Sequence, residues 1–204
     1  MTVLTIIQAR VDSTRLPGKA LMPIAGKPMF LYVVEAALPP LVVAIPQGDL
    51  ALSQICDEMG ILVASRPTPE DVLGRFVEAV RVATDHYEQE FSHILRLTGD
   101  CPMLTRDMVE RFLRACVMDQ DTICTNRPLD PDGIDMELFP TRALLGAYEK
   151  ANNPYDREHV TPAIYRILKT QHLRVTNWDP NDKISVDTRE DYASVKYIME
   201  CRVK

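Results

Sequence analysis

The chain has 204 residues, of which 46% are hydrophobic and 25% are charged, a composition typical of one soluble globular domain. The formal net charge is −6, from 23 Lys and Arg residues against 29 Asp and Glu residues, which argues against nucleic-acid binding because that needs a basic surface. No apolar run approaches the roughly 18–20 residues that span a bilayer, and no basic segment precedes the short apolar run at the N-terminus, so we expect neither membrane insertion nor a signal peptide. The five cysteines show no CxxC spacing, which predicts reduced thiols and a cytoplasmic protein.

Segments with strand-like and helix-like patterns alternate along the chain. Short apolar, β-branched runs predict strands, and apolar residues at helical spacing predict helices. Pro28 and Thr105 mark helix starts, and Gly60 marks a helix end. In chain order the patterns predict a strand at residues 3–8, a helix at 28–38, a strand at 41–45, a helix at 50–59, a strand at 61–64, a helix at 69–87, a strand at 93–98, a helix at 105–118, a strand at 122–125, helices at 141–151 and 156–168, strands at 173–176 and 184–186, and a helix at 188–201. Thr188 and Asp191 have the spacing of a capping box for the last helix.

This alternation predicts βαβ units and therefore an α/β fold, a single-domain, Rossmann-like, mostly parallel sheet flanked by helices. We expect one domain over residues 1–204, because no repeat or interdomain linker interrupts the pattern. Ligands of such sheets bind beyond the C-terminal ends of the strands. The residues directly after each predicted strand are therefore the first candidates for a functional site.

The loop after the first predicted strand gathers three cations. Arg10, Arg15 and Lys19 lie close together in the sequence, beside Ser13 and Gly18. Arginine forks pair with phosphate oxygens, lysine supplies a mobile charge, and backbone N–H groups in a turn complete an anion site. The loop therefore suits a triphosphate, with a solvated basic loop as the alternative. GxxxxGK[ST] and GxGxxG are both absent, so ATPase and dinucleotide-cofactor functions lack their fingerprints.

Two aspartates directly follow predicted strands. Asp100 lies in the segment TGDCP and Asp187 in the segment VDTRED. Mg²⁺ prefers one or two carboxylates together with phosphate oxygens and water, so the pair predicts a magnesium site, although an aspartate after a strand also serves as a helix N-cap. Asp130 and Asp132 form a competing DxD pair of the kind that binds metal in many glycosyltransferases. Pro-Asp-Gly is also a common turn sequence, and we favour the turn.

The segment IIQARVDSTRLPGKALMPIAGKPM resembles the opening of the sugar cytidylyltransferases, which include CMP-KDO synthetase, CMP-sialic acid synthetase and the spore coat polysaccharide biosynthesis protein F group. The segments TGDCP, VDTRED, PDGIDME and REHVT also resemble that group. The resemblance implies a nucleotide-diphospho-sugar transferase (GT-A-like) fold. It implies that the nucleotide is bound by Ala9, Arg10, Ser13, Arg15, Lys19 and Asp100. Among these, Arg15, Lys19 and Asp100 would be catalytic, and Asp100 and Asp187 would bind Mg²⁺.

The resemblance also assigns residues to the nucleoside and the sugar. Arg66 lies where related synthetases contact the nucleoside. Asp135 and Glu137 share one face of an extended segment and would bind sugar hydroxyls or a second metal, with ordinary charges on an exposed edge strand as the alternative. Arg157 and His159 are the remaining candidates for sugar binding. His159 would act as a proton relay, or it is a structural or exposed histidine.

These assignments predict an enzyme that uses Mg²⁺ to transfer CMP from CTP to a sugar and that releases pyrophosphate, in surface polysaccharide or glycoconjugate biosynthesis. CTP and a sugar are the expected partners, without nucleic acid or membrane. A homodimer is expected from the related synthetases, through an insertion for sugar binding or dimerisation around residues 126–167. Two alternatives stay open, a metal-dependent glycosyltransferase that uses Asp130 and Asp132, and a relative that binds CTP without turnover.

Overall fold

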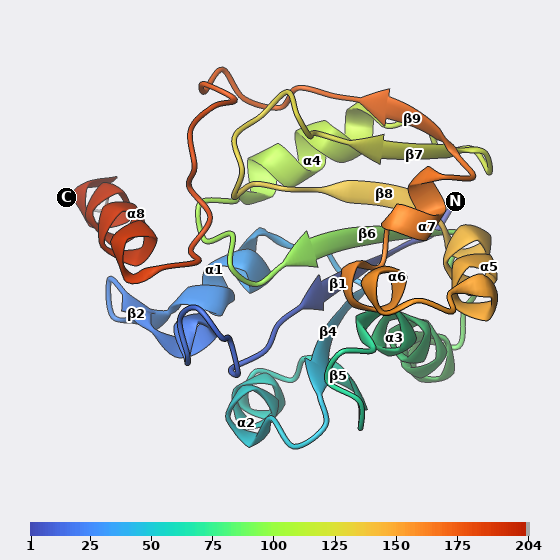
Figure 1. The fold of residues 1–204 in the computed structure, drawn as a ribbon, viewed down its shortest axis with the longest axis horizontal. Helices are drawn as coiled ribbons and strands as arrows, with labels where there is room; N and C mark the ends of the chain where they lie inside the picture. The colour runs from blue at the N-terminus through green and yellow to red at the C-terminus, as the bar shows by residue number, and fades with distance from the viewer. Residues whose placement is uncertain (203–204) are drawn as a thin grey trace.

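The computed structural model describes residues 1–202, and a seven-stranded sheet runs through its centre (Figure 1). The strands lie in the order β5-β4-β1-β6-β8-β7-β9. Their bounds are β1 (Val3–Gln8), β4 (Leu41–Pro46), β5 (Leu62–Arg66), β6 (His93–Thr98), β7 (Thr122–Thr125), β8 (Glu137–Pro140) and β9 (Lys169–His172), and a separate ribbon consists of β2 (Pro23–Ile24) and β3 (Lys27–Pro28). Neighbouring strands of the large sheet are parallel except where β8 pairs with β6 and β7. The predicted α/β fold with a mostly parallel sheet is confirmed.

Helices cover both faces of the sheet, because side chains alternate between the two faces along each strand. On β1, Ile7 enters one apolar core, and Leu4 and Ile6 enter the other. The first core takes side chains from α1 (Met29–Ala36), α2 (Leu50–Glu58), α4 (Arg106–Ala115) and α8 (Arg189–Arg202), and the second from α3 (Val72–Tyr87), α5 (Thr141–Lys150) and α7 (Pro162–Tyr165). Each fully buried isoleucine contributes about 1.5–3 kcal/mol relative to an exposed one, so the central strands form a rigid base for the loops at the sheet edge. Within residues 1–202, no helix has both the length and the apolar composition needed to cross a bilayer.

The helix caps predicted from the sequence are present. The Thr105 hydroxyl accepts a hydrogen bond from Met108 N (3.4 Å) at the start of α4. At the start of α8, Thr188 N donates to the Asp191 carboxylate (2.9 Å) and Asp191 N donates to the Thr188 hydroxyl (3.2 Å). This reciprocal pair is the predicted capping box, and it fixes the chain directly after Asp187.

The strand order reverses beside β1. From β1 the chain adds β4 and then β5 on one side, and it later returns to place β6 on the other side. Gln8 at the end of β1 is level with Thr98 at the end of β6, so Ala9 and Gly99 leave the sheet together. Gly99 N donates to Gln8 O (2.9 Å), and a Cβ added at Gly99 would lie 3.1 Å from the Cβ of Ala9. Such a switch point at the C-terminal edge is where α/β sheets bind ligands.

The strands predicted at residues 173–176 and 184–186 are not formed. The strand in this part of the chain is β9, which ends before residue 173. The N–H groups of Val175 and Thr176 donate to the carboxylate of Asp130 (2.8 and 3.0 Å) and are therefore not available to a sheet. The N–H groups of Ile184 and Ser185 both donate to the carbonyl of Asp132 (2.7 and 2.9 Å). Apolar composition predicted both strands, but their backbone donors are bound by the Asp130 carboxylate and by loop carbonyls.

β8 is a strand that the sequence patterns did not predict. Only Leu138 and Phe139 are apolar in its interior, and they point into the two different cores. The charged residues Asp135 and Glu137 precede them and Pro140 follows, so the short run resembled the end of a loop. Its insertion between β6 and β7 is decided by long-range pairing, because four residues are too few for a distinct period of two.

The helix predicted at residues 156–168 is split into α6 (Pro154–His159) and α7. Between them, Val160 has φ 67° and ψ −62°, and Thr161 N donates to His159 O (2.8 Å). This is a γ-turn with positive φ, a rare and strained conformation for a β-branched residue. Pro162 has no N–H with which to continue the first helix. The turn directs the end of α6 towards the switch point.

Candidate active site

The loop that leaves β1 is closed by one backbone hydrogen bond and is anchored to the side chain of Asp49, directly before α2. Gly18 N donates to Val11 O (2.9 Å), and Val11 N donates to the carboxylate of Asp49 (2.8 Å). Gly18 has φ 77°, which favours glycine because it lacks a Cβ. The closure places Lys19 at the first position of a short 3₁₀ helix (Lys19–Leu21), beside the end of β6.

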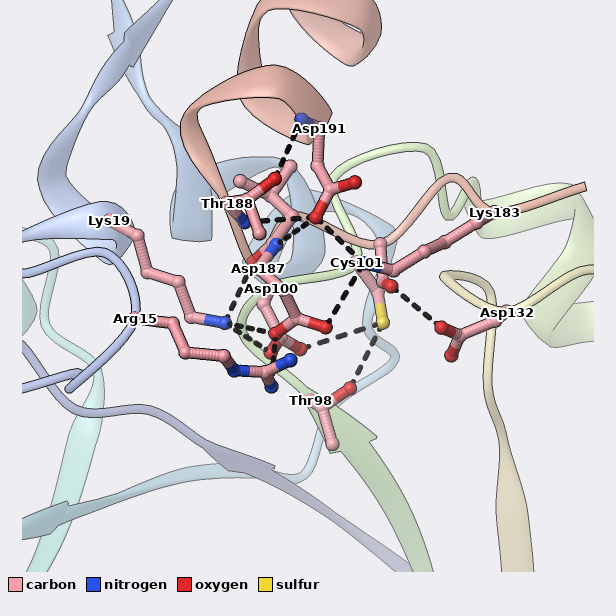
Figure 2. A network of polar contacts seen from close by, with 12 residues as sticks. Arg15, Lys19, Thr98, Asp100, Cys101, Asp132, Lys183, Asp187, Thr188 and Asp191 are labelled. Atoms are coloured by element: carbon pink, nitrogen blue, oxygen red, sulfur yellow. Dashed lines mark hydrogen bonds and ion pairs between the residues drawn. The ribbon is translucent and has the colours of Figure 1, made fainter.

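Lys19 lies between the two aspartates that the sequence singled out (Figure 2). Its ammonium donates to Asp100 Oδ2 (2.8 Å), to Asp187 Oδ1 (3.1 Å) and to the carbonyl of Val186 (2.7 Å). Arg15 Nη2 also donates to Asp187 Oδ1 (2.8 Å). The Lys19 side chain is 12% exposed and that of Arg15 is 65% exposed, so Lys19 is the inner cation and Arg15 the outer one.

Asp187 is held in place from both directions along the chain. Its backbone N–H donates to the Asp191 carboxylate (3.0 Å), and Val186 N donates to Asp100 O (3.1 Å), which ties the two aspartate segments together. Burial acts to raise the pKa of Asp187, but the hydrogen bond and charge of Lys19 outweigh it, with help from Arg15, and the pKa is lowered overall. Asp187 is therefore ionised at neutral pH.

The two aspartates fit a divalent cation, because their oxygens already converge on one cationic atom, the ammonium nitrogen of Lys19. Within residues 1–202, no group of three or more His, Cys, Asp or Glu side chains is arranged to hold a metal ion. Mg²⁺ commonly takes only one or two carboxylates and completes its shell with phosphate oxygens and water. Asp100 and Asp187 thus suit a metal that arrives with a phosphorylated ligand.

A cavity of about 420 Å³ opens over the loop and the switch point. We call it the loop cavity. Its lining includes all the loop residues predicted to bind nucleotide and both aspartates, namely Ala9, Arg10, Ser13, Arg15, Lys19, Asp100 and Asp187. The structure thus brings together residues from three separate parts of the chain, near its start, its middle and its end.

Arg75, on α3, is a cavity residue that the sequence analysis did not select. It is only 2% exposed and lines the loop cavity. Its Nη1 donates to the carbonyl of Pro69 (2.7 Å), while its buried Nε has no hydrogen-bond partner. Burial, followed by the charge of Arg10, lowers the pKa of Arg75. One feature of the sequence could have identified Arg75. It lies three residues after Val72 and therefore on the buried face of α3.

A second cavity, of about 290 Å³, adjoins the first. The two share Arg15, Thr98, Asp100, His159 and Asp187. The remaining lining of the second cavity is Arg96, Cys101, Arg127, Asp132, Asp135, Glu137 and Ser185. We call it the acidic cavity. Its shared wall places any molecule within it beside the two aspartates.

Two of the predicted sugar-binding residues, Asp135 and Glu137, lie in the acidic cavity but differ in their partners. Glu137 is buried, pairs with Arg96, and accepts hydrogen bonds from Tyr165 (2.7 Å) and Thr161 (3.2 Å). Asp135 has one buried oxygen, Oδ1, without a hydrogen-bond partner. Glu137 therefore holds β8 against α7. One carboxylate oxygen of Asp135 remains without a hydrogen bond.

His159, Arg157 and Arg66 occupy different surroundings. His159 lines both cavities. Arg157 lines neither of them, and its guanidinium donates to the carbonyls of Ala151 (2.9 Å) and Tyr148 (3.3 Å). Arg66 also lies outside both linings, 5.9 Å from the ring centre of Tyr148. The structure therefore brings His159, but not Arg157 or Arg66, to the two aspartates.

The DxD pair does not form a joint metal site. Asp130 is 3% exposed, and its carboxylate accepts hydrogen bonds from the backbone of Val175 and Thr176. Asp132 alone of the two lines the acidic cavity, where it accepts a hydrogen bond from the hydroxyl of Ser185 (2.8 Å). The metal pair required by the glycosyltransferase alternative is thus absent, and the turn that we favoured is present.

Comparisons with family models, with curated proteins and with solved structures each gave matches over most of the chain. A family model described as cytidylyltransferase matches residues 4–200. Spore coat polysaccharide biosynthesis protein SpsF of Bacillus subtilis is 30% identical over 97% of this chain and 86% of its own length. A solved cytidylyltransferase from Leptospira borgpetersenii has a TM-score of 0.83 at 26% identity, over 98% of this chain and 87% of its own. A solved CMP:2-keto-3-deoxy-manno-octonic acid synthetase in complex with CTP shares the fold, with a TM-score of 0.69 at 20% identity over 99% of this chain and 100% of its own.

Proposed function

Because the chain belongs to the cytidylyltransferase family, we propose that it transfers CMP from CTP to a hydroxyl of a sugar and releases pyrophosphate. One observation carries the proposal. The cationic loop after β1 meets Asp100 and Asp187 in a single cavity, at the switch point of the sheet, and a second cavity opens from the same wall. A nucleotide in the first cavity and a sugar in the second would meet beside the two aspartates.

The triphosphate is bound by the loop. Arg10 and Arg15 offer forked donors to phosphate oxygens, and Ser13 and the backbone of Ala9 line the same surface. We add Arg75 to this set. Its unpaired buried nitrogen is costly in the absence of an anion, so an incoming phosphate would gain from a charge that is already desolvated.

Asp100 and Asp187 are the residues that would hold Mg²⁺, in a shell that phosphate oxygens and water complete. The metal would polarise the α-phosphate and neutralise charge on the leaving group. Lys19 then exchanges its two carboxylate partners for a phosphate oxygen. Its ammonium thus serves first to bridge the two carboxylates and offset their mutual repulsion, and later to offset charge that develops on the reacting phosphate.

In the reaction, the sugar oxygen forms a bond to the α-phosphorus as the bond from that phosphorus to the bridging oxygen breaks. The electron pair leaves with pyrophosphate, and the hydroxyl proton passes to the imidazole of His159, which lines both cavities. Most of the rate enhancement comes from positioning and from fixed charges. Arg15, Lys19 and Asp100 are the proposed catalytic residues, and His159 is the proposed proton relay.

Other features of the proposal rest on the family resemblance. Arg66 contacts the nucleoside and Arg157 contributes to the sugar site, each after a rearrangement of its present contacts. The protein acts in the cytoplasm, in polysaccharide or glycoconjugate biosynthesis. It forms a homodimer through residues 126–167, the insertion that also supplies the sugar site.

The test is release of pyrophosphate from CTP with Mg²⁺ in the presence of a panel of sugars. Lys19→Ala and Asp100→Asn should each lower kcat by about 10²–10³-fold, the usual cost of removing a fixed charge that stabilises the transition state. Lys150→Ala and Asp57→Asn are matched controls, because both side chains are exposed and lie outside the two cavities. CTP binding without pyrophosphate release for any sugar would favour the non-catalytic alternative. Unchanged kcat in both site variants would reject these roles.

A further inference from the structure

His159 lies at the wall that the two cavities share, and the contacts of its own side chain restrain it little. Within residues 1–202, the imidazole has no hydrogen-bond partner, and its ring neighbour is Tyr155, one turn earlier on α6, with ring centres 4.5 Å apart. Tyr155 is 61% exposed, so this contact is open to water. The position of the imidazole is therefore set by the backbone that leaves α6.

That backbone is the γ-turn at Val160, whose φ of 67° and ψ of −62° are strained for a β-branched residue. A strained turn persists only where its surroundings hold it. On one side of the turn, the Val160 side chain is fully buried in the second apolar core. On the other side, the hydroxyl of Thr161 donates to the Glu137 carboxylate (3.2 Å).

Glu137 is a fixed anchor for Thr161. Its carboxylate pairs with Arg96 and accepts a hydrogen bond from the Tyr165 hydroxyl (2.7 Å), while Tyr165 N donates to the carbonyl of Thr161 (2.9 Å). Arg96 and Glu137 line the acidic cavity, so the anchor belongs to the wall that the sugar would contact. The Thr161 hydroxyl thus connects this wall to the turn that follows His159.

We propose that Thr161 is a positioning residue, whose hydroxyl ties the strained turn at Val160 to Glu137 and thereby presents the imidazole of His159 to both cavities. The inference rests on the proposed function, in which His159 receives the proton of the sugar hydroxyl. Thr161 lines neither cavity and acts through the backbone alone. Without its hydroxyl the turn relaxes, and a displacement of about 1 Å at a reacting group costs up to about 10²-fold in rate.

The experiment is a double-variant cycle on pyrophosphate release from CTP with Mg²⁺. The sugars are hexoses, hexosamines, uronic acids and 2-keto-3-deoxy sugar acids, and the fastest of them serves for every variant. Thr161→Val keeps the shape of the side chain and leaves Glu137 its bonds to Arg96 and Tyr165. It should lower kcat about tenfold and leave the KM for CTP unchanged, and Thr161→Ser should restore most of the loss.

The second arm of the cycle is His159→Gln, which should lower kcat about 10²-fold by removal of the proton relay. Adding Thr161→Val to this variant should lower kcat no further, because the hydroxyl acts through the imidazole. Thr5→Val is the matched control. Thr5 is also a buried threonine, donates its hydroxyl to the carbonyl of Leu38 (2.6 Å) and lines neither cavity, so kcat should stay the same.

A second readout needs no turnover. Labelling with ¹⁵N gives ring signals for the four histidines of the chain, and the signals absent from His159→Gln identify His159. Thr161→Val should shift the His159 signals and leave those of the other three histidines unchanged, whereas Thr161→Ser and Thr5→Val should shift none.

The strain itself is tested at Val160. Glycine adopts a φ of 67° without the penalty of a Cβ, so Val160→Gly should have a higher thermal midpoint than Val160→Ala. This is the reverse of the order at an ordinary helical position. A lower midpoint for the glycine variant would show that the turn is not strained and would overturn the inference.

Two further results overturn the inference, a loss of kcat in Thr161→Val that adds in full to that of His159→Gln, and His159 ring signals that do not move. Unchanged kcat in His159→Gln removes the proton relay and this inference with it, while pyrophosphate release still supports the transfer of CMP. Absence of release with every sugar overturns the proposed function instead. The ring signals then still decide whether Thr161 positions His159.

Discussion

The loop cavity and the acidic cavity share a wall, yet their separate walls differ in charge. The loop cavity adds Arg10, Lys19 and Arg75 with a single carboxylate, that of Glu158. The acidic cavity adds three carboxylates and two guanidiniums. The cationic wall of the loop cavity matches a triphosphate, and the mixed polar wall of the acidic cavity matches a sugar. The difference also shows that counting charged side chains in a cavity is a poor guide to function. A side chain that is already paired within the protein is not free to bind a ligand.

Arg75 and Arg96 illustrate that point. Both are largely buried arginines that line a cavity. Arg96 is matched by Glu137, whereas Arg75 retains an unpaired nitrogen. A buried ion pair is expensive to break, and a buried unpaired charge is expensive to keep. Stability should therefore depend on the acidic cavity, and ligand affinity on the loop cavity.

The largest expected effect is on stability, in Glu137→Gln. The substitution leaves Arg96 buried without its counter-charge, and the free energy of unfolding should fall by about 3 kcal/mol. Urea denaturation followed by circular dichroism measures the change. Glu110→Gln, which breaks an exposed pair with Arg114 on α4, is the control and should change stability by less than about 1 kcal/mol. Equal effects in the two variants would contradict a structural role for the Arg96–Glu137 pair.

A smaller effect is expected on ligand affinity, in Arg75→Met. Loss of a charged donor to phosphate should weaken CTP binding by about 10–100-fold. The thermal midpoint without ligand should stay the same or rise, because methionine removes a buried charge and keeps most of the side-chain volume. Arg81→Met on the exposed face of the same helix is the matched control and should leave both quantities unchanged. A lower midpoint together with unaltered CTP affinity would show that Arg75 is structural only.

A third effect, confined to alkaline pH, is a pH dependence that comes from Asp135. Its pKa of about 7 in the folded protein exceeds the ordinary value of 3.8, so the folded state holds a proton that the unfolded state has lost between these values. Its contribution to stability is present below about pH 4 and is lost as the pH rises through 7. Asp135→Asn should therefore raise the thermal midpoint at pH 8 and leave it unchanged at pH 4. An equal shift at both pH values would exclude this explanation.

The sequence by itself determined the regular part of the molecule. Apolar periodicity located β1, β4, β5, β6 and β7 and most of the helices. Cap residues such as Thr105 and Asp191 marked helix starts through hydrogen bonds to neighbours in the chain. The same local reasoning placed Asp100 and the loop cations after strands. Parallel strands bring their C-terminal ends to one edge, so a common site for these residues followed without coordinates.

Only the tertiary structure decided which polar side chains are already committed. Asp130 binds backbone donors from 45 residues further along the chain, and Arg157 binds carbonyls of a neighbouring helix end. Arg75 has the same chemistry as other arginines in the sequence, and its burial became visible only when α3 was packed on the sheet. Local patterns depend on periodicity and short-range hydrogen bonds, which the order of residues encodes directly. Burial and the choice of a partner depend on distances between remote segments, and those distances exist only in the folded chain.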